Sequence, residues 1–102
     1  RIPTMNVSAM DITVLLQKPI SAAQINTLFT EFAAQSGGII GCNNEPLASI
    51  DFNHDARSCI VDLTQTCISG DRMLKLFIWF DNEWAYANRM LDVAAQMMKL
   101  NR

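Results

Sequence analysis

Several residue types are scarce in this 102-residue sequence, and each scarcity excludes a class of protein. Only 18% of the residues are charged and the formal net charge is −2, which argues against binding to nucleic acid or to an anionic membrane. The three cysteines, Cys42, Cys59 and Cys67, are an odd number without a CxxC spacing, so neither a disulfide framework nor a zinc site is favoured. No apolar run approaches the roughly 20 residues that cross a bilayer. We therefore expect reduced thiols and a cytoplasmic protein.

The remaining composition is typical of one folded domain. Half of the residues are hydrophobic, which argues against an intrinsically disordered chain. Two domains within this length would each be too small to bury a core, and no repeat, low-complexity tract or linker interrupts the chain. Residues 1–102 are therefore interpreted as a single domain.

The first third of the chain predicts a strand followed by a helix. Residues 6–17 alternate apolar side chains at Ile12, Val14 and Leu16, which is typical of a strand, and Pro19 ends it. Ser21 stands three residues before Gln24, the spacing of a helix capping box. Apolar residues then recur at helical spacing until Gly37 and Gly38, which favour the left-handed conformation that stops a helix. The apolar residues of this helix are Ile25, Leu28, Phe29 and Phe32.

The rest of the chain predicts further strands and a second helix. Residues 37–42 suggest a short strand or turn, 43–58 a polar loop, and 58–69 one strand with Cys59, Val61 and Leu63 on alternate positions. After a turn at 69–72, residues 73–80 are almost continuously apolar, as expected for a central strand covered on both faces. A helix from Glu83 to Leu100 follows, with Asp81 or Asn82 as its cap.

This last helix has an unusually wide apolar surface. Its polar residues form one narrow stripe, whereas a helix on one sheet face needs an apolar stripe of only about 100°. We therefore expect a second apolar surface to contact it. The stripe consists of Asn88, Asp92, Gln96 and Lys99. The order of elements predicts an α+β fold, β-α-β-β-β-α, with helices packed on a mostly antiparallel or mixed sheet.

Two groups of residues could form a metal-binding or a catalytic site, but a purely structural role is preferred for each. Asp51, Asn53, Asp55 and Asp62 occupy the first, third, fifth and twelfth positions of a calcium-type loop, but the sixth is Ala56 rather than Gly and the twelfth is not Glu. An ordinary polar loop is preferred, and no metal ligand is assigned.

His54 is the only histidine, and a nucleophilic pair with one of the three cysteines depends on a geometry that sequence does not give. A loop or interface position for His54 is preferred. The glycines lack the GxGxxG order of a dinucleotide-binding turn.

The segment FDNEWAYANRM, residues 80–90, places three polar residues at one junction. Asp81 and Asn82 can each cap the following helix, and Glu83 suits the positive end of its dipole. Capping requires only one of them, so the stretch carries more polar residues than the helix needs.

This segment also carries a family resemblance. RIPTMNVSAMDITV at the start and WFDNEWAYANRMLD near the end together closely resemble the glyceraldehyde-3-phosphate dehydrogenase family. EPLASIDFNHDARSCIVDLTQT, between them, also fits, so the resemblance covers essentially the whole chain. DFNHD, IVDxTQT and ANRML are more similar to the erythrose-4-phosphate dehydrogenase branch than to the glycolytic one.

The resemblance implies that the chain is the C-terminal part of a dehydrogenase catalytic domain. In the family, a separate Rossmann domain binds NAD and an SCTTN-type motif supplies a cysteine that forms a thioester with the sugar-phosphate substrate, with a histidine as the base. This chain has none of these segments, and its own cysteines and His54 do not match. No catalytic residue is therefore assigned, and the isolated chain is expected to be inactive.

Three residues match binding positions of the family. Arg1, which opens the RIPT motif, corresponds to an arginine that binds the substrate phosphate, Asn82 to the asparagine that holds the nicotinamide carboxamide of NAD, and Tyr86 to an aromatic residue near that ring. Ala85 stands where the family usually has Gly, and Ala56-Arg57 where it has Pro-His. The resemblance also implies a homo-oligomer, a homotetramer in the family. The alternative is a non-catalytic binding or assembly module that retains the fold.

Overall fold

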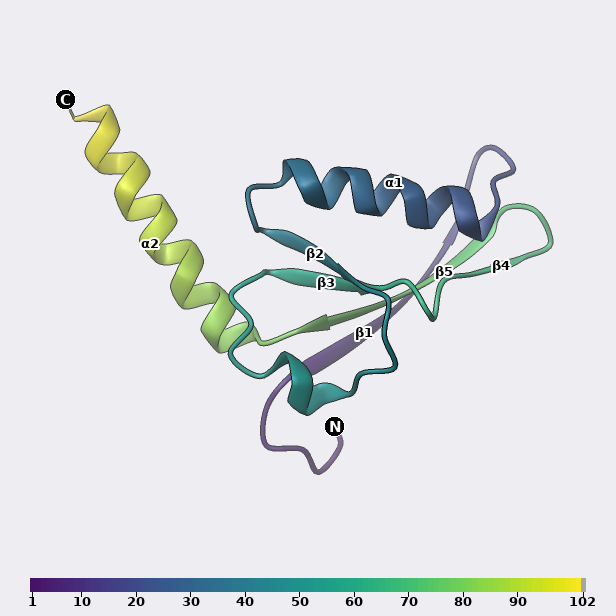
Figure 1. The fold of residues 1–102 in the computed structure, drawn as a ribbon, viewed down its shortest axis with the longest axis horizontal. Coiled ribbons are helices and arrows are strands. Elements are labelled where there is room, and N and C mark those ends of the chain that lie inside the picture. The colour runs from purple at the N-terminus through teal and green to yellow at the C-terminus, as the bar shows by residue number, and fades with distance from the viewer. Residues whose placement is uncertain (102) are drawn as a thin grey trace.

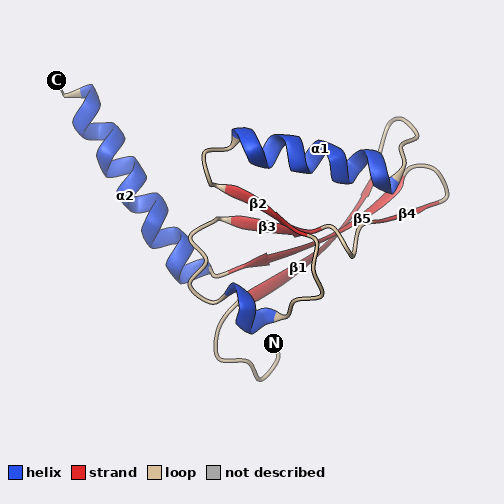
Figure 2. Cartoon of the chain, viewed as in Figure 1, coloured by secondary structure: helices blue, strands red, loops and turns tan. Residues whose placement is uncertain are grey.

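The structure, a computed structural model, describes residues 1–101. Its strands are β1 (Ser8–Leu15), β2 (Ile40–Asn43), β3 (Cys59–Asp62), β4 (Cys67–Ser69) and β5 (Met73–Phe80). Its helices are α1 (Ala22–Gln35), α2 (Asn82–Leu100) and the short 3-10 helix η1 (Ser49–Phe52). This confirms the α+β fold and its mixed sheet (Figure 2).

The sheet is built around β5. Its order is β1-β5-β3-β2, and β4 also pairs with β5. β1 and β5 run antiparallel along their whole lengths, from Ser8 opposite Phe80 to Leu15 opposite Met73, whereas β2 and β3 are parallel. Figure 1 shows α1 lying over one face of the sheet, while α2 extends away from it. The residue before β1, Val7, has φ 70°, a conformation that is strained for a β-branched side chain.

The predicted limits of α1 are confirmed in atomic detail. The Ser21 hydroxyl accepts a hydrogen bond from Gln24 N at 3.2 Å, and Gln24 Oε1 accepts one from Ser21 N at 3.0 Å. This reciprocal pair satisfies two of the free N–H groups at the start of the helix. After the helix, Gly37 and Gly38 have φ values of 66° and 84°, which glycine adopts without steric cost.

Residues 58–69 do not form one strand, so that prediction was wrong. β3 ends at Asp62, and the Asp62 carboxylate accepts hydrogen bonds from Thr64 N at 3.1 Å and Thr64 Oγ1 at 2.6 Å. Such a side-chain bond to the backbone two residues later closes a tight turn. The chain therefore turns after β3, and β4 pairs with a different part of β5.

The core consists of two small clusters on opposite faces of the sheet. Ile25 of α1 packs against Val61, Leu74 and Leu76. On the other face, Val7, Phe52 and Ile60 pack together with Trp79, and the Phe52 and Trp79 rings stack at 5.4 Å. The expectation that β5 is covered on both faces was wrong for its first half, because Met73 and Lys75 are exposed on the side away from α1.

Helix α2 makes few contacts with the rest of the domain. Ala85 is its only buried residue, and its apolar side chains from Met90 onward are exposed. Two contacts attach its first turns: Trp84 stacks on His54 with ring centroids 4.3 Å apart, and Arg89 Nη1 donates to Ser58 Oγ at 3.1 Å. Within residues 1–101, no helix has the length and apolarity required to span a membrane.

One loop residue packs closely against β2. Arg57 forms a bidentate pair with Asp55, with N–O distances of 2.9 and 2.7 Å, and its guanidinium lies across Gly41. A β-carbon at position 41 would collide with that side chain. The Arg57 guanidinium holds the pKa of Asp55 below its usual value.

Candidate functional site

The cap of α2 is Asp81, which settles the choice left open by the sequence. One carboxylate oxygen of Asp81 accepts a hydrogen bond from Trp84 N at 3.1 Å, the geometry of an N-cap. Asn82 is then the first residue of the helix, and its side chain is not used for capping. Capping therefore uses one of the three polar residues at this junction.

The second oxygen of Asp81 joins two other segments. It accepts a hydrogen bond from the Asn6 amide at 2.8 Å and from His54 N at 2.8 Å. Asp81 is 0% exposed, so it has exchanged water for these three protein donors. Burial acts to raise the pKa of Asp81, but the bonds from His54, Trp84 and Asn6 outweigh it, and the pKa lies below its usual value. The carboxylate is therefore charged at neutral pH.

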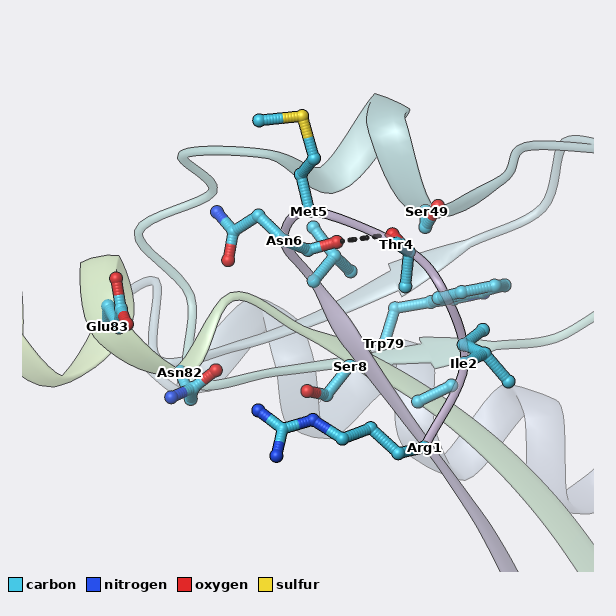
Figure 3. Close-up of a pocket in the computed structure, with 12 residues that line it drawn as sticks. Arg1, Ile2, Thr4, Met5, Asn6, Ser8, Ser49, Trp79, Asn82 and Glu83 are labelled. Atoms are coloured by element: carbon cyan, nitrogen blue, oxygen red, sulfur yellow. Dashed lines mark hydrogen bonds between the residues drawn. The ribbon is translucent and has the colours of Figure 1, made fainter.

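Beside this junction lies a pocket of about 550 Å³, a size common for small-molecule sites. The chain's first nine residues supply most of its lining, with further residues from η1, β5 and the start of α2. Figure 3 shows the Arg1 side chain extending toward Ser8 and Asn82. The polar residues of the lining are Arg1, Thr4, Asn6, Ser8, Ser49, Asn82 and Glu83.

The structure brings two of the three predicted binding residues together. Arg1 and Asn82, at opposite ends of the chain, both line this pocket. Neither the Arg1 guanidinium nor the Asn82 amide has a hydrogen-bond or ion-pair partner among residues 1–101, so their donors are available to a ligand. Tyr86 is 67% exposed and does not line the pocket, although it lies one helical turn beyond Asn82.

The cysteines lie away from the pocket. Cys42 and Cys59 pack against the core cluster beneath α1, and burial raises the pKa of both thiols. Cys67 is exposed on β4. His54 stacks on Trp84 at the α2 junction instead, so the structure does not bring it together with a thiol.

The calcium-like loop residues are engaged separately. Asp51 accepts from Ala48 N, Asn53 from the Asn6 amide, and Asp55 from Arg57. Asp62 accepts from Thr64 and from the Trp79 indole, at 3.0 Å for the latter. Over residues 1–101, no three His, Cys, Asp or Glu side chains are grouped closely enough to hold a metal ion.

A family model described as the C-terminal domain of glyceraldehyde 3-phosphate dehydrogenase matches residues 1–82. The chain belongs to this family. The matched range contains the sheet, α1, the pocket-lining N-terminal segment and Asn82, whereas Tyr86 and the rest of α2 lie beyond it. The family assignment makes the protein a relative of oxidoreductases that act on sugar phosphates.

Sequence reasoning missed the part that Asn6 and Asp81 play in this dehydrogenase domain. Asp81 was recognised as a possible cap, but its bonds to Asn6 and His54 join residues that are distant along the chain. An acidic residue directly after a buried strand was the available signal. It does not show which distant donors the carboxylate meets.

Proposed function

We propose that this domain is the C-terminal portion of the catalytic domain of an NAD-dependent aldose-phosphate dehydrogenase that oxidises erythrose 4-phosphate or glyceraldehyde 3-phosphate. The observation that supports this most directly is that Arg1 and Asn82 line one pocket, with neither side chain hydrogen-bonded to another residue among 1–101. Between them they offer a charge for a phosphate and an amide for a carboxamide.

Arg1 suits a phosphate because its planar guanidinium presents paired donors and stays charged at all physiological pH values. Ser8, whose side chain also lines the pocket, offers a hydroxyl on the same side as Arg1 in Figure 3. The acidic Glu83 lines the pocket as well and would disfavour an anion placed beside α2. We therefore assign the substrate phosphate to the Arg1 side of the pocket.

Asn82 suits the nicotinamide end of NAD because an amide both donates and accepts hydrogen bonds, as a carboxamide does. The Asn82 side chain, at the first position of α2, fits the carboxamide of NAD. Tyr86, one turn further on, would lie near the nicotinamide ring. When bound, NAD accepts the hydride that leaves the substrate. The residues of this chain bind and orient the reactants, and the nucleophilic cysteine belongs to a segment outside this sequence.

The similarity of DFNHD, IVDxTQT and ANRML supports erythrose 4-phosphate as the preferred substrate. In this proposal the enzyme is cytoplasmic and works as a homotetramer. The 102-residue chain by itself, which lacks the thioester-forming cysteine motif, is expected to form no NADH with either sugar phosphate.

The test uses the full-length enzyme and two substitutions. Asn82→Asp keeps the shape of the side chain but loses the donor and adds a charge, so KM for NAD should rise by roughly 5- to 150-fold, equivalent to about 1–3 kcal/mol. Arg1→Lys keeps the charge but loses the paired donors, so KM for the sugar phosphate should rise while that for NAD does not.

Asn44→Asp is the matched control, because Asn44 is an exposed loop residue away from the pocket. It should leave both KM values unchanged. If Asn82→Asp and Arg1→Lys behave like this control, the pocket does not bind the dehydrogenase ligands and the proposal is wrong.

A further inference from the structure

The segment that carries Arg1 makes its side-chain hydrogen bonds to the other described segments through one residue. Within it, Thr4 N donates to Ile2 O at 2.8 Å, and Thr4 Oγ1 donates to Asn6 O at 3.1 Å, which makes a compact loop. Of the side-chain hydrogen bonds made by residues 1–7, those that reach other described segments both come from the Asn6 amide, to Asn53 and to Asp81. Packing of Val7 against Phe52 and Ile60 holds the end of this loop next to β1, and the hydrogen bonds that position the rest of it come from Asn6.

The other pocket residue, Asn82, is placed by the same carboxylate. Asp81 caps α2 through one oxygen and holds Asn6 through the other, so the loop that carries Arg1 and the helix that begins with Asn82 share one acceptor group. His54 N completes the set, because it donates to the same oxygen as Asn6. Asp81 does not line the pocket and is 0% exposed, so it does not contact a ligand there.

A helix cap alone does not account for this arrangement. Capping uses the oxygen that faces Trp84 N, and a neutral Asn would serve there as well as Asp. The second oxygen serves only the two donors from distant segments, and its charge strengthens both bonds.

We propose that Asp81 is a positioning residue, which sets the Arg1 loop and Asn82 at a fixed separation by holding Asn6 and the start of α2 on one carboxylate. The proposal rests on the function assigned to the pocket above. Its signature is a joint effect: loss of the carboxylate disturbs the binding of the sugar phosphate and of NAD together, although the residue touches neither.

Asp81→Asn in the full-length enzyme separates positioning from capping. The amide keeps one oxygen for Trp84 N, but its NH2 group then faces two donors, Asn6 Nδ2 and His54 N, and bonds neither. We expect KM to rise about 5- to 30-fold for both NAD and the sugar phosphate. A change confined to melting temperature, with both KM values within about two-fold of the wild type, would overturn the proposal.

A reversed pair tests the contact itself. Asn6→Asp alone places two carboxylates against each other and should raise both KM values, whereas Asn6→Asp combined with Asp81→Asn restores one donor facing one acceptor. The double variant should recover a large part of both KM values relative to Asn6→Asp. If the KM change of the double variant equals the product of the changes in the two single variants, the proposal is wrong. If Asp81→Asn does not fold, Asn6→Ala, which keeps the cap and the carboxylate, should still raise KM for the sugar phosphate, and an unchanged value would count against positioning.

Asn26→Ala is the matched control for a purely structural loss. Asn26 lies on α1, and its amide donates to Leu63 O at 3.1 Å, far from the pocket lining. It should lower the melting temperature without changing either KM. Asn82→Asp and Arg1→Lys, measured beside these variants, separate the two ideas. If each of them changes its own ligand while Asp81→Asn changes neither, only the positioning role fails.

Discussion

The two long helices of this domain both begin with a side-chain cap but differ in how they pack on the sheet. Ser21 caps α1 and Asp81 caps α2, each by accepting from a backbone N–H three residues on. Yet Ile25 of α1 is 7% exposed beneath the helix, whereas Leu91 of α2 is 70% exposed. The difference shows that local signals start a helix whether or not a surface is present to receive its apolar face.

What α1 has and α2 lacks is a sheet face of matching width. The α1 side of the sheet presents Val61, Leu74 and Leu76 in one patch, so a narrow stripe on α1 is enough. Helix α2 is attached at its first turns through Asp81, Trp84 and Arg89. Beyond these, its apolar side chains, called here the apolar rows of α2, stay exposed in the described chain. They are Met90, Leu91, Val93, Met97, Met98 and Leu100. Ile25 therefore anchors α1 on the sheet, although Leu28 and Phe32 of that helix stay more than half exposed, whereas α2 leaves all its apolar side chains from Met90 onward exposed.

The largest expected effect comes from truncating the packed helix. Ile25→Ala in the 102-residue chain should lower the free energy of unfolding by about 2–5 kcal/mol, because it opens a cavity under α1. Leu91→Ala should change it by no more than about 0.5 kcal/mol, because the side chain is exposed and Ala favours helix. Urea unfolding followed by circular dichroism measures both. Equal losses in the two variants would mean that α2 is packed after all.

The next effect is the acid sensitivity of the α2 junction. Because the pKa of Asp81 is lowered in the folded state, its contribution is fully present above the ordinary carboxyl pKa of about 3.9 and is lost as pH falls through the lower, folded value. Hydrogen bonds to a charged group contribute about 1.5–3 kcal/mol, so the expected loss of unfolding free energy lies toward the lower end of the range for Ile25→Ala.

The free energy of unfolding, measured with urea at a series of acidic pH values, should therefore fall less steeply with decreasing pH for Asp81→Asn than for the wild type. The Asp55–Arg57 pair titrates in the same direction in both proteins, because the pKa of Asp55 is also lowered, so it cancels in the comparison. Parallel curves for the two proteins would refute the assignment of acid sensitivity to this carboxylate.

The smallest expected effect on stability is that of Leu91→Glu, which should instead change the self-association of the chain. The exposed apolar rows of α2 favour self-association, so light scattering at micromolar concentration should report a dimer or larger species. Leu91→Glu should reduce that mass while changing the unfolding free energy by no more than about 0.5 kcal/mol.

Gln96→Glu adds the same charge to the polar stripe of the helix and is the control for it. It should leave the measured mass as in the wild type. A monomer in the unmodified chain would show that the apolar rows of α2 do not associate.

Much of the fold could be predicted because its signals are local. The Ser21–Gln24 box and the glycine pair fixed α1 within a residue or two, and the alternation at Ile12 and Val14 identified β1. The break between β3 and β4 was missed because the apolar alternation continues through Leu63, while the turn is made by an Asp62 side chain that any strand could carry. The parallel pairing of β2 with β3 was likewise invisible, since register is set by partners distant in sequence.

The candidate site divides in the same way. Arg1 and Asn82 were identified only through a family resemblance. They line one pocket because β1 and β5 pair antiparallel along their whole lengths, which places Ser8 opposite Phe80. No spacing within one segment encodes that meeting. The triple acceptor role of Asp81 depends on the same pairing, since it brings Asn6 beside the end of β5.

The contact of Arg57 with Gly41 links two positions that are distant in this sequence. A side chain at position 41 would occupy the space that the guanidinium fills, and Arg57 is itself fixed by its paired bonds to Asp55. A β-carbon at position 41 would require the Arg57 side chain to move aside, which disturbs its paired bonds to Asp55. The two positions, sixteen residues apart, are therefore expected to be coupled, with a larger residue at 41 costing less once Arg57 is shortened.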